Sequence, residues 1–262
     1  MRHRNGWGVL TGLIMGTALA WSLADSLAGP GLADETTDKL AEVEQRAAAS
    51  ERYRAEFTLT VVEQGQATIL AGQILYQRPD KRRIEFNNIP GVEDVAQVIV
   101  SDGTSEWQYF PRRRIVQKTE WARLQSAGIP AEALAVRGPH QPFVDVRRET
   151  IRYVGIRKDQ EPAVYLFEAE PSAPLVAEAP FEPGKFRVEV APEDGLVRRL
   201  TMTDAEGREV LRQEYTKIER DAAIGADAFS FTIPDGVEVV DITEDRIQAA
   251  APAAPTPSAG GP

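Results

Sequence analysis

The chain has 262 residues, 42% hydrophobic and 27% charged, which is enough apolar material for a packed core and enough charge for a water-facing surface. Its formal net charge of -10 argues against nucleic acid as a partner, because phosphates require a basic footprint. It contains no cysteine and only two histidines, which excludes disulfides, thiol nucleophiles and Cys-ligated zinc. We therefore expect no cofactor and no metal site.

The first residues have the layout of a secretory signal peptide. Met1–Asn5 is short and basic, Gly6–Ala24 carries no charge, and small-residue cleavage patterns occur at Ala18–Ala20 and Gly31–Ala33. This order predicts a signal peptide over residues 1–33, cut after the second pattern, and export of the remaining chain. The alternative is an uncleaved membrane anchor, because the uncharged run approaches the length of a spanning helix.

One amphipathic helix is predicted next. Within Glu35–Tyr53, the apolar residues Leu40, Val43 and Ala47 recur at helical spacing in a charged background. Their stripe must cover another apolar surface. It serves either as ordinary packing on a sheet or as a lid over a cavity.

From Glu56 onward the apolar residues recur with period two, which predicts strands. Short turns join these strands, such as Ser101–Thr104 with its central Asp-Gly pair, so the sheet should be antiparallel. The strands are predicted at Phe57–Val62, Thr68–Gln77, Arg82–Asn87, Val95–Val100, Glu106–Tyr109, Arg114–Lys118, Thr150–Ile156, Ala163–Ala169, Phe186–Ala191, Arg198–Thr203, Glu209–Ile218 and Val237–Ile242.

Two segments depart from the strand pattern. Trp121–Phe143 is apolar but interrupted by glycine and proline, so we expect short helices and loops that form a mobile cover, with Leu134 and Val136 among its apolar residues. Ala249–Pro262 is rich in alanine and proline without an apolar pattern, which predicts a disordered tail.

Three blocks of sequence carry a resemblance that periodicity alone does not give. They are Gly72–Pro79 with the strand Arg82–Phe86 behind it, Val98–Gly103 followed by Trp107–Pro111, and Phe229–Val237. Their order and spacing are similar to the periplasmic lipoprotein carrier family of Gram-negative bacteria, the LolA proteins. The likeness extends from about Asp38 to about Ile242.

The resemblance implies a fold and a domain organisation. The expected class is α+β, mainly β, with an incomplete antiparallel β-barrel whose concave hydrophobic side is covered by helices. The carrier domain would occupy residues 34–248, between the signal peptide and the tail at 249–262.

The resemblance also implies a task. The protein would take acylated lipoproteins from an inner-membrane lipoprotein-releasing transporter and pass them to an outer-membrane acceptor, working in the periplasm as a monomer. Such transfer needs a difference in affinity between donor, carrier and acceptor, and it needs no bond-making.

Several residues are candidates for this task. Leu40 and Val43, with Leu134 and Val136, are candidate lid residues. The candidate cavity residues are apolar or aromatic positions on alternating strands, although some of them could belong to an ordinary core on the other side of the sheet. The six are Ile74, Tyr76, Ile84, Phe86, Trp107 and Tyr109.

Two arginines stand near these positions. Arg78 occupies the Arg-Pro position of the family, where the resemblance implies that the arginine bonds to the lid and controls its opening; the alternative is a solvated charge at a turn. Arg82 departs from the family, which usually has an aromatic or large apolar residue there. If Arg82 faces inward, it pairs with an anionic headgroup or narrows the cavity; if the strand is shifted by one residue, Arg82 is simply exposed. The departure leaves room for a lipid other than a lipoprotein as cargo.

The remaining polar residues do not indicate an enzyme active site. Arg112–Arg114 is a basic cluster that is either solvated or in contact with a phosphate-bearing ligand or an acidic partner. His140 is interpreted as a surface histidine. Ser101 and Asp102 lie in a predicted hairpin turn, and the chain has no Gly-x-Ser-x-Gly elbow, so a catalytic triad with His140 is not predicted.

Two further functions compete with the carrier. A periplasmic sensor of the sigma-factor-regulator type has a first domain that resembles this fold, followed by an additional folded domain. The third possibility is an outer-membrane biogenesis factor that uses the fold as an interaction scaffold.

Overall fold

The structure is a computed structural model that describes residues 30–63, 65–88, 97–129, 138–173, 176 and 181–250. Residues 1–29 of the predicted signal peptide lie outside the described residues, as do residues 251–262 of the predicted tail and the candidate lid residues Leu134 and Val136.

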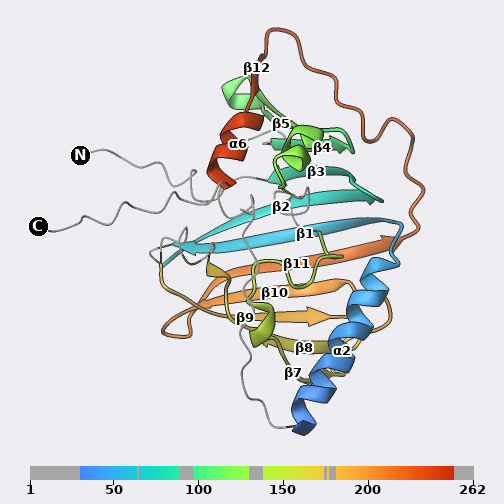
Figure 1. The fold of residues 1–262 in the computed structure, drawn as a ribbon, viewed down its shortest axis with the longest axis vertical. Coiled ribbons are helices and arrows are strands. Elements are labelled where there is room, and N and C mark those ends of the chain that lie inside the picture. The colour runs from blue at the N-terminus through green and yellow to red at the C-terminus, as the bar shows by residue number, and fades with distance from the viewer. Residues whose placement is uncertain are drawn as a thin grey trace, which may run out of the picture.

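One sheet of twelve strands forms the body of the molecule (Figure 1). Its strands follow the order β12-β6-β5-β4-β3-β2-β1-β11-β10-β9-β8-β7. Neighbours pair antiparallel, except that β12 runs parallel to β6. The strands are β1 Arg52–Glu63, β2 Gln66–Gln77, β3 Lys81–Asn88, β4 Gln97–Asp102, β5 Ser105–Phe110, β6 Ile115–Glu120, β7 Arg152–Arg157, β8 Val164–Ala169, β9 Pro183–Val190, β10 Val197–Asp204, β11 Glu209–Arg220 and β12 Glu238–Asp241.

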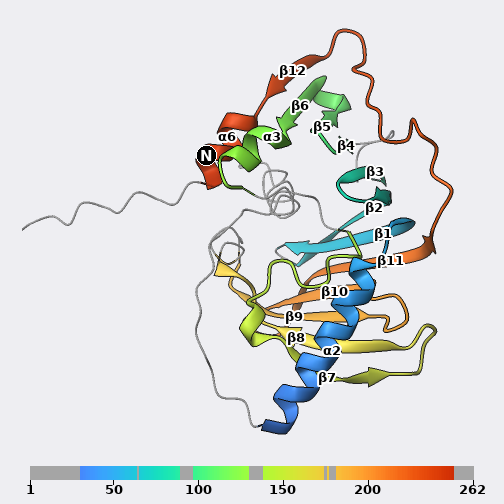
Figure 2. The ribbon, with the colours of Figure 1, turned by 45° about the vertical axis from the view of Figure 1, so that its right-hand side comes forward.

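Because β12 and β7 stand at opposite ends of this order, the sheet is an open, unclosed barrel. The predicted fold class, an incomplete antiparallel β-barrel that is mainly β, is confirmed. The helices are α2 Pro30–Ala48, α3 Trp121–Ser126 and α6 Thr243–Ala250, with the 3₁₀ turns η1 Pro111–Arg113 and η2 Arg148–Thr150. In Figure 2, α2 crosses the strands around β7 and β8, while α3 and α6 lie together beside β6.

Alternation along the strands explains how the sheet buries one face. In β1, Tyr53, Ala55, Phe57 and Leu59 are buried while the residues between them are exposed or half-buried. The tight turn after β4 depends on Gly103, whose φ of 92° favours glycine. The predicted hairpin at this position is confirmed, with β4 and β5 paired antiparallel.

The N-terminal helix ends earlier than the sequence predicted. It ends at Ala48 instead of Tyr53, and Tyr53 belongs to β1, because its side chain is the first of the period-two series that packs in the core. The helix begins at Pro30, within the predicted signal peptide. Helix α6 was not predicted, and its last residues overlap the start of the predicted tail.

The C-terminal segment wraps around one edge of the sheet. After β11, Phe231 lies against Trp107 and Tyr109, with ring centroids 6.0 and 6.1 Å apart. Arg114 then holds the carbonyl of Gly236 at 3.2 Å. The chain next adds β12 to the sheet edge and returns as α6 on the other face (Figure 2).

Candidate functional site

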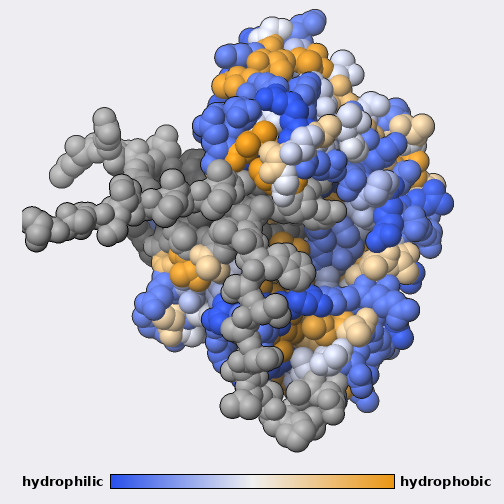
Figure 3. Space-filling model, viewed as in Figure 1, coloured by the Kyte–Doolittle hydropathy of each residue, from blue (hydrophilic) through white to orange (hydrophobic). Residues whose placement is uncertain are grey.

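One face of the sheet carries the main hydrophobic core, and we call it the concave face. Strand pairing places Ile74, Ile84 and Ile99 side by side on this face. Farther along the sheet, Phe167 and Val188 are adjacent, and both are fully buried. Apolar surface is visible on this side of the molecule between α2 and the strands and around α6 (Figure 3). At these strands the concave face therefore offers an apolar wall.

Helix α2 covers part of this wall. Val43 is fully buried in the main core, and the half-buried Leu40 packs against the same core. Lys39 adds polar contacts at the edge, with Nζ 3.0 Å from the Tyr165 hydroxyl and 3.1 Å from Glu42. Of the four candidate lid residues, Leu40 and Val43 thus lie over the concave face, and their role as a lid stays a prediction.

A row of polar and aromatic side chains crosses the same face at one end of six strands. Cα pairing places each member opposite the next, so all six side chains point to the concave side. All are buried, and none is more than 8% exposed. We call this the polar row: Tyr53, Tyr76, Arg82, Ser101, Glu106 and Thr119.

At the aromatic end of the row, His140 packs onto the two tyrosines. Its ring stacks on Tyr76 at a centroid distance of 4.0 Å, and its Nδ1 lies 2.7 Å from the hydroxyl of Tyr53. Gly138 lets the backbone approach, because a Cβ there would lie 2.1 Å from that same hydroxyl oxygen. His140 is therefore an anchoring residue, and its interpretation as a surface histidine is wrong.

The environment of His140 keeps its imidazole neutral. Burial lowers the pKa of His140 from 6.5 to about 3, and the charges of Arg82 and Arg78 act in the same direction. A neutral ring accepts or donates a single hydrogen bond at Nδ1, which suits the contact with Tyr53. Burial also raises the pKa of Tyr53, so that hydroxyl stays protonated.

Glu106 is the centre of the other end of the row. Arg82 donates to its Oε2 from Nε at 3.2 Å and from Nη2 at 2.6 Å. Gln108 and Arg246 donate to its Oε1 at 3.0 and 3.3 Å. Burial alone would raise the pKa of Glu106, but the charges of Arg82 and Arg246 outweigh it and lower that pKa. Glu106 is therefore an ionised, hydrogen-bonded carboxylate.

Helices α3 and α6 attach to this end of the row. Trp121 of α3 donates from its indole nitrogen to Ser101 Oγ at 3.0 Å, and its ring lies 5.2 Å from the guanidinium of Arg82. Arg246 comes from α6. The row thus joins the sheet to a loop and to two helices that cover it.

The structure separates the six candidate cavity residues into two sets. Ile74, Tyr76, Ile84 and Phe86 lie on the concave face and are buried. Trp107 and Tyr109 point to the opposite face, because the neighbours Glu106 and Gln108 take the concave positions of β5. Phe231 covers Trp107 and Tyr109 there.

The arginines also take distinct positions. Arg82 faces inward and pairs with Glu106, whereas Arg78 is exposed at the turn after β2, where its backbone N–H donates to Glu51 at 2.8 Å. In the basic cluster, Arg112 and Arg113 are exposed, and Arg114 contacts the C-terminal segment.

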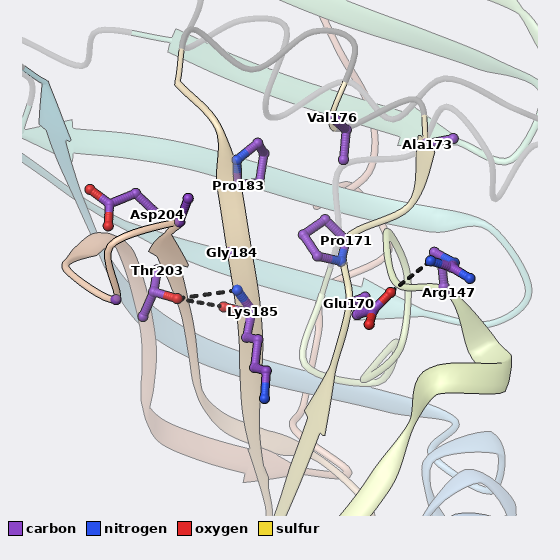
Figure 4. Close-up of a pocket in the computed structure, with 12 residues that line it drawn as sticks. Arg147, Glu170, Pro171, Ala173, Val176, Pro183, Gly184, Lys185, Thr203 and Asp204 are labelled. Carbon is purple, nitrogen blue, oxygen red and sulfur yellow. Dashed lines mark hydrogen bonds and ion pairs between the residues drawn. The ribbon is translucent and has the colours of Figure 1, made fainter.

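A separate pocket of about 860 Å³ opens where β8 and β10 end and β9 begins (Figure 4). Apolar side chains such as Pro171 and Pro183 share its wall with Arg147 and Lys185. Arg147 pairs with Glu170 at 2.6 Å, and Lys185 lies 3.9 Å from Glu168. No candidate cavity residue lines this pocket, and its cations are already paired.

Among the described residues, no group of three or more histidine, aspartate or glutamate side chains is placed to hold a metal ion. No helix in the described ranges combines the length and the apolarity that crossing a membrane requires.

Sequence comparison gives one informative relative, and no protein-family model matches the chain. The outer-membrane lipoprotein carrier protein of Nitrosomonas europaea is 24% identical over 196 residues, which cover 72% of this chain and 82% of the relative. The predicted resemblance to lipoprotein carriers is therefore confirmed.

Structure comparison agrees on the fold. The crystal structure of an uncharacterized conserved protein from Thermus thermophilus matches with a TM-score of 0.52 and 13% identity, over 79% of this chain and 99% of that one. This likeness shows the fold alone. A LolA superfamily protein from Nitrosomonas europaea matches over 75% of this chain and 97% of its own, with a TM-score of 0.36 and 10% identity, too low to carry an argument.

Proposed function

We propose, because the chain is LolA-like, that it carries acyl chains across the periplasm by sheltering them between the concave face and its covering segments. The observation that carries this proposal is the apolar wall of an open sheet, which in the described part of the chain is covered by helices and loops and not by a second sheet. Such covers can move aside without breaking strand pairing. The wall residues Ile74, Ile84 and Phe86 and the lid residues Leu40 and Val43 belong to this site.

The energetics explain why a carrier is needed. Exposing one methylene to water costs about 0.8 kcal/mol, so an acyl chain of roughly fifteen methylenes would cost on the order of 12 kcal/mol to cross unshielded. A wall that returns most of this apolar contact makes transit possible. Release then requires only that the acceptor bind the acyl chain better than the carrier does.

The cellular setting follows the same proposal. The chain is exported by its N-terminal signal, and residues 34–248 act as a monomeric carrier domain. It receives acylated lipoproteins or other lipids from an inner-membrane transporter and delivers them to an outer-membrane acceptor. The carrier performs no bond-making step.

The test is native mass spectrometry of the protein purified from the periplasm, followed by titration with a fluorescent fatty acid. We expect bound acyl species and saturable uptake of the probe. A stoichiometric protein partner without lipid would favour a regulatory function. Absence of both lipid and probe uptake would sink the carrier proposal.

Two matched variants locate the site. Leu200 of β10 is half-buried against the core of the concave face, so Leu200→Glu should weaken probe binding at least about tenfold, since a charge there opposes burial of an acyl chain. Leu166 of β8 is also half-buried but alternates with the concave residue Phe167, so it lies on the opposite face. Leu166→Glu should leave binding within about twofold, because it leaves the wall unchanged.

A further inference from the structure

We infer that helix α6 is a releasable cover on the concave face, latched by Arg246 onto Glu106 and lifted when cargo enters or leaves. The inference rests on the proposed function, because the cargo is what passes beneath the helix. Helix α6 spans Thr243–Ala250, at the C-terminal end of the described residues.

The first observation is that α6 is attached mainly by polar contacts. Besides the Arg246 latch, Thr243 Oγ1 accepts from the backbone N–H of Glu120 at 3.0 Å, and Glu244 pairs with Arg123 at 3.1 Å. Water can replace such hydrogen bonds when the helix lifts, so the net cost of breaking them is small.

The apolar contact of α6 is small by comparison. Its Ile247 packs on a satellite cluster made of Trp121, Leu124 and Ile129, which is separate from the main core. Helix α2, in contrast, inserts Val43 into the main core itself. Lifting α6 therefore exposes less apolar surface than lifting α2.

The second observation is that Glu106 keeps its partners when Arg246 leaves. Removing the only partner of a buried carboxylate is strongly destabilising, because the charge is left uncompensated. Here Arg82 still holds Oε2 with two hydrogen bonds, and Gln108 still donates to Oε1. The contact between Arg246 and Glu106 can therefore break without leaving the Glu106 carboxylate unpaired.

The third observation is an unsatisfied acceptor beneath the cover. Gln108 is only 1% exposed, and its Oε1 has no hydrogen-bond partner among the described residues. A buried acceptor left in this way destabilises the closed state, and water that enters removes this penalty. This residue therefore opposes the closed state, which keeps the cover from binding too tightly.

Hydrogen–deuterium exchange of the full chain without lipid tests the opening directly. We expect the amides of α6 to exchange at least about tenfold faster than those at the centre of α2, and still faster in Arg246→Ala. The matched control is Arg46→Ala, which removes an exposed pair with Glu42 at 3.1 Å within α2 and should leave α6 unchanged. Protection of α6 equal to that of α2, or no response to Arg246→Ala, would overturn the inference.

Release of a fluorescent fatty acid to acceptor vesicles tests the role in cargo exchange. We expect release to be about tenfold faster from Arg246→Ala and from a chain that ends at Ile242, since each removes the latch. A chain that ends at Ala250 keeps α6 and should match the full chain. Equal release from all four proteins would overturn the inference that α6 is a releasable cover. Failure of the full chain to take up any probe would instead contradict the proposed function. In that case the hydrogen–deuterium exchange of α6 would still test whether the helix opens.

Discussion

The concave face combines two regions that are stabilised in opposite ways. Around Phe167 and Val188 the side chains are apolar, and burying them stabilises the fold whatever the exact orientation of their contacts. Along the polar row, Arg82 and Glu106 are also buried but must meet their partners at hydrogen-bond distance. The first region gives the sheet an apolar wall. The second gives it fixed attachment points.

The covers follow the same division. Helix α2 docks on the apolar region through Val43, whereas α6 docks on the polar row through Arg246. An apolar contact becomes costly to break in proportion to its area, while a polar contact exchanges for water. This difference indicates that the apolar region stabilises the fold, while the polar row holds the cover that can be released.

The largest expected effect is in the apolar region. Phe167→Ala should destabilise the fold by about 4 kcal/mol, because it leaves a cavity between β8 and the packed ring of Phe143. Urea unfolding measures this loss. Val154→Ala, at a position 51% exposed on the neighbouring strand, is the control and should change the free energy of unfolding by less than about 0.5 kcal/mol. Similar losses for both would contradict the assignment of Phe167 to a close-packed wall.

A somewhat smaller effect is expected in the polar row. Glu106→Leu leaves Arg82 and Arg246 buried without their shared carboxylate and should cost about 3 kcal/mol in the same unfolding assay. The double variant Glu106→Leu with Arg82→Leu should recover part of this loss, since an apolar pair tolerates burial and only Arg246 then lacks the carboxylate. A double variant less stable than the single one would show that the row is not held by this ion pair.

The strands could be predicted from the sequence because period two persists over long runs, as it does through Phe57 and Leu59. The face of each strand was harder to assign. Alternation defines two sets in β5, and the apolar set with Trp107 was expected inside, but the register with Ile84 and Ile99 places Gln108 there instead. Only the pairing of distant strands carries that information.

Two parts of the site had no local signal at all. His140 follows a glycine and a proline, and nothing in that segment indicates that it contacts Tyr53 and Tyr76 on the sheet. Helix α6 has eight residues and one large apolar side chain, Ile247, so its pattern is too short to be recognised. Its position depends on Arg246 meeting Glu106, a contact between residues far apart in the chain.

An intermediate effect is expected from pH at the aromatic end of the row. The pKa of His140 is lowered from 6.5 to about 3 in the folded protein, so the unfolded chain binds the proton more readily. The contribution of neutral His140 to the free energy of unfolding is fully present above pH 6.5 and is lost as the pH falls toward 3. Between pH 7 and pH 5 the protein should lose roughly 2 kcal/mol of stability from this residue. Unfolding curves of the wild type and His140→Gln at both pH values isolate this contribution. An equal pH dependence in the two proteins would show that His140 does not titrate in this way.

The smallest effect on stability is expected at Arg78, which lies outside the row. Arg78→Leu should change the free energy of unfolding by less than about 0.5 kcal/mol, because the side chain is exposed, its hydrogen bond to Tyr76 is readily replaced by water, and the backbone bond to Glu51 remains. Its charge nevertheless reaches the row, since Arg78 helps to lower the pKa of His140. An NMR titration of His140 should therefore show a higher pKa in this variant than in the wild type. The resemblance implies that Arg78 controls the opening of the lid, which requires slower release of a fluorescent fatty acid from the variant. An unchanged release rate would show that Arg78 has no such role and that the polar row alone attaches the covers.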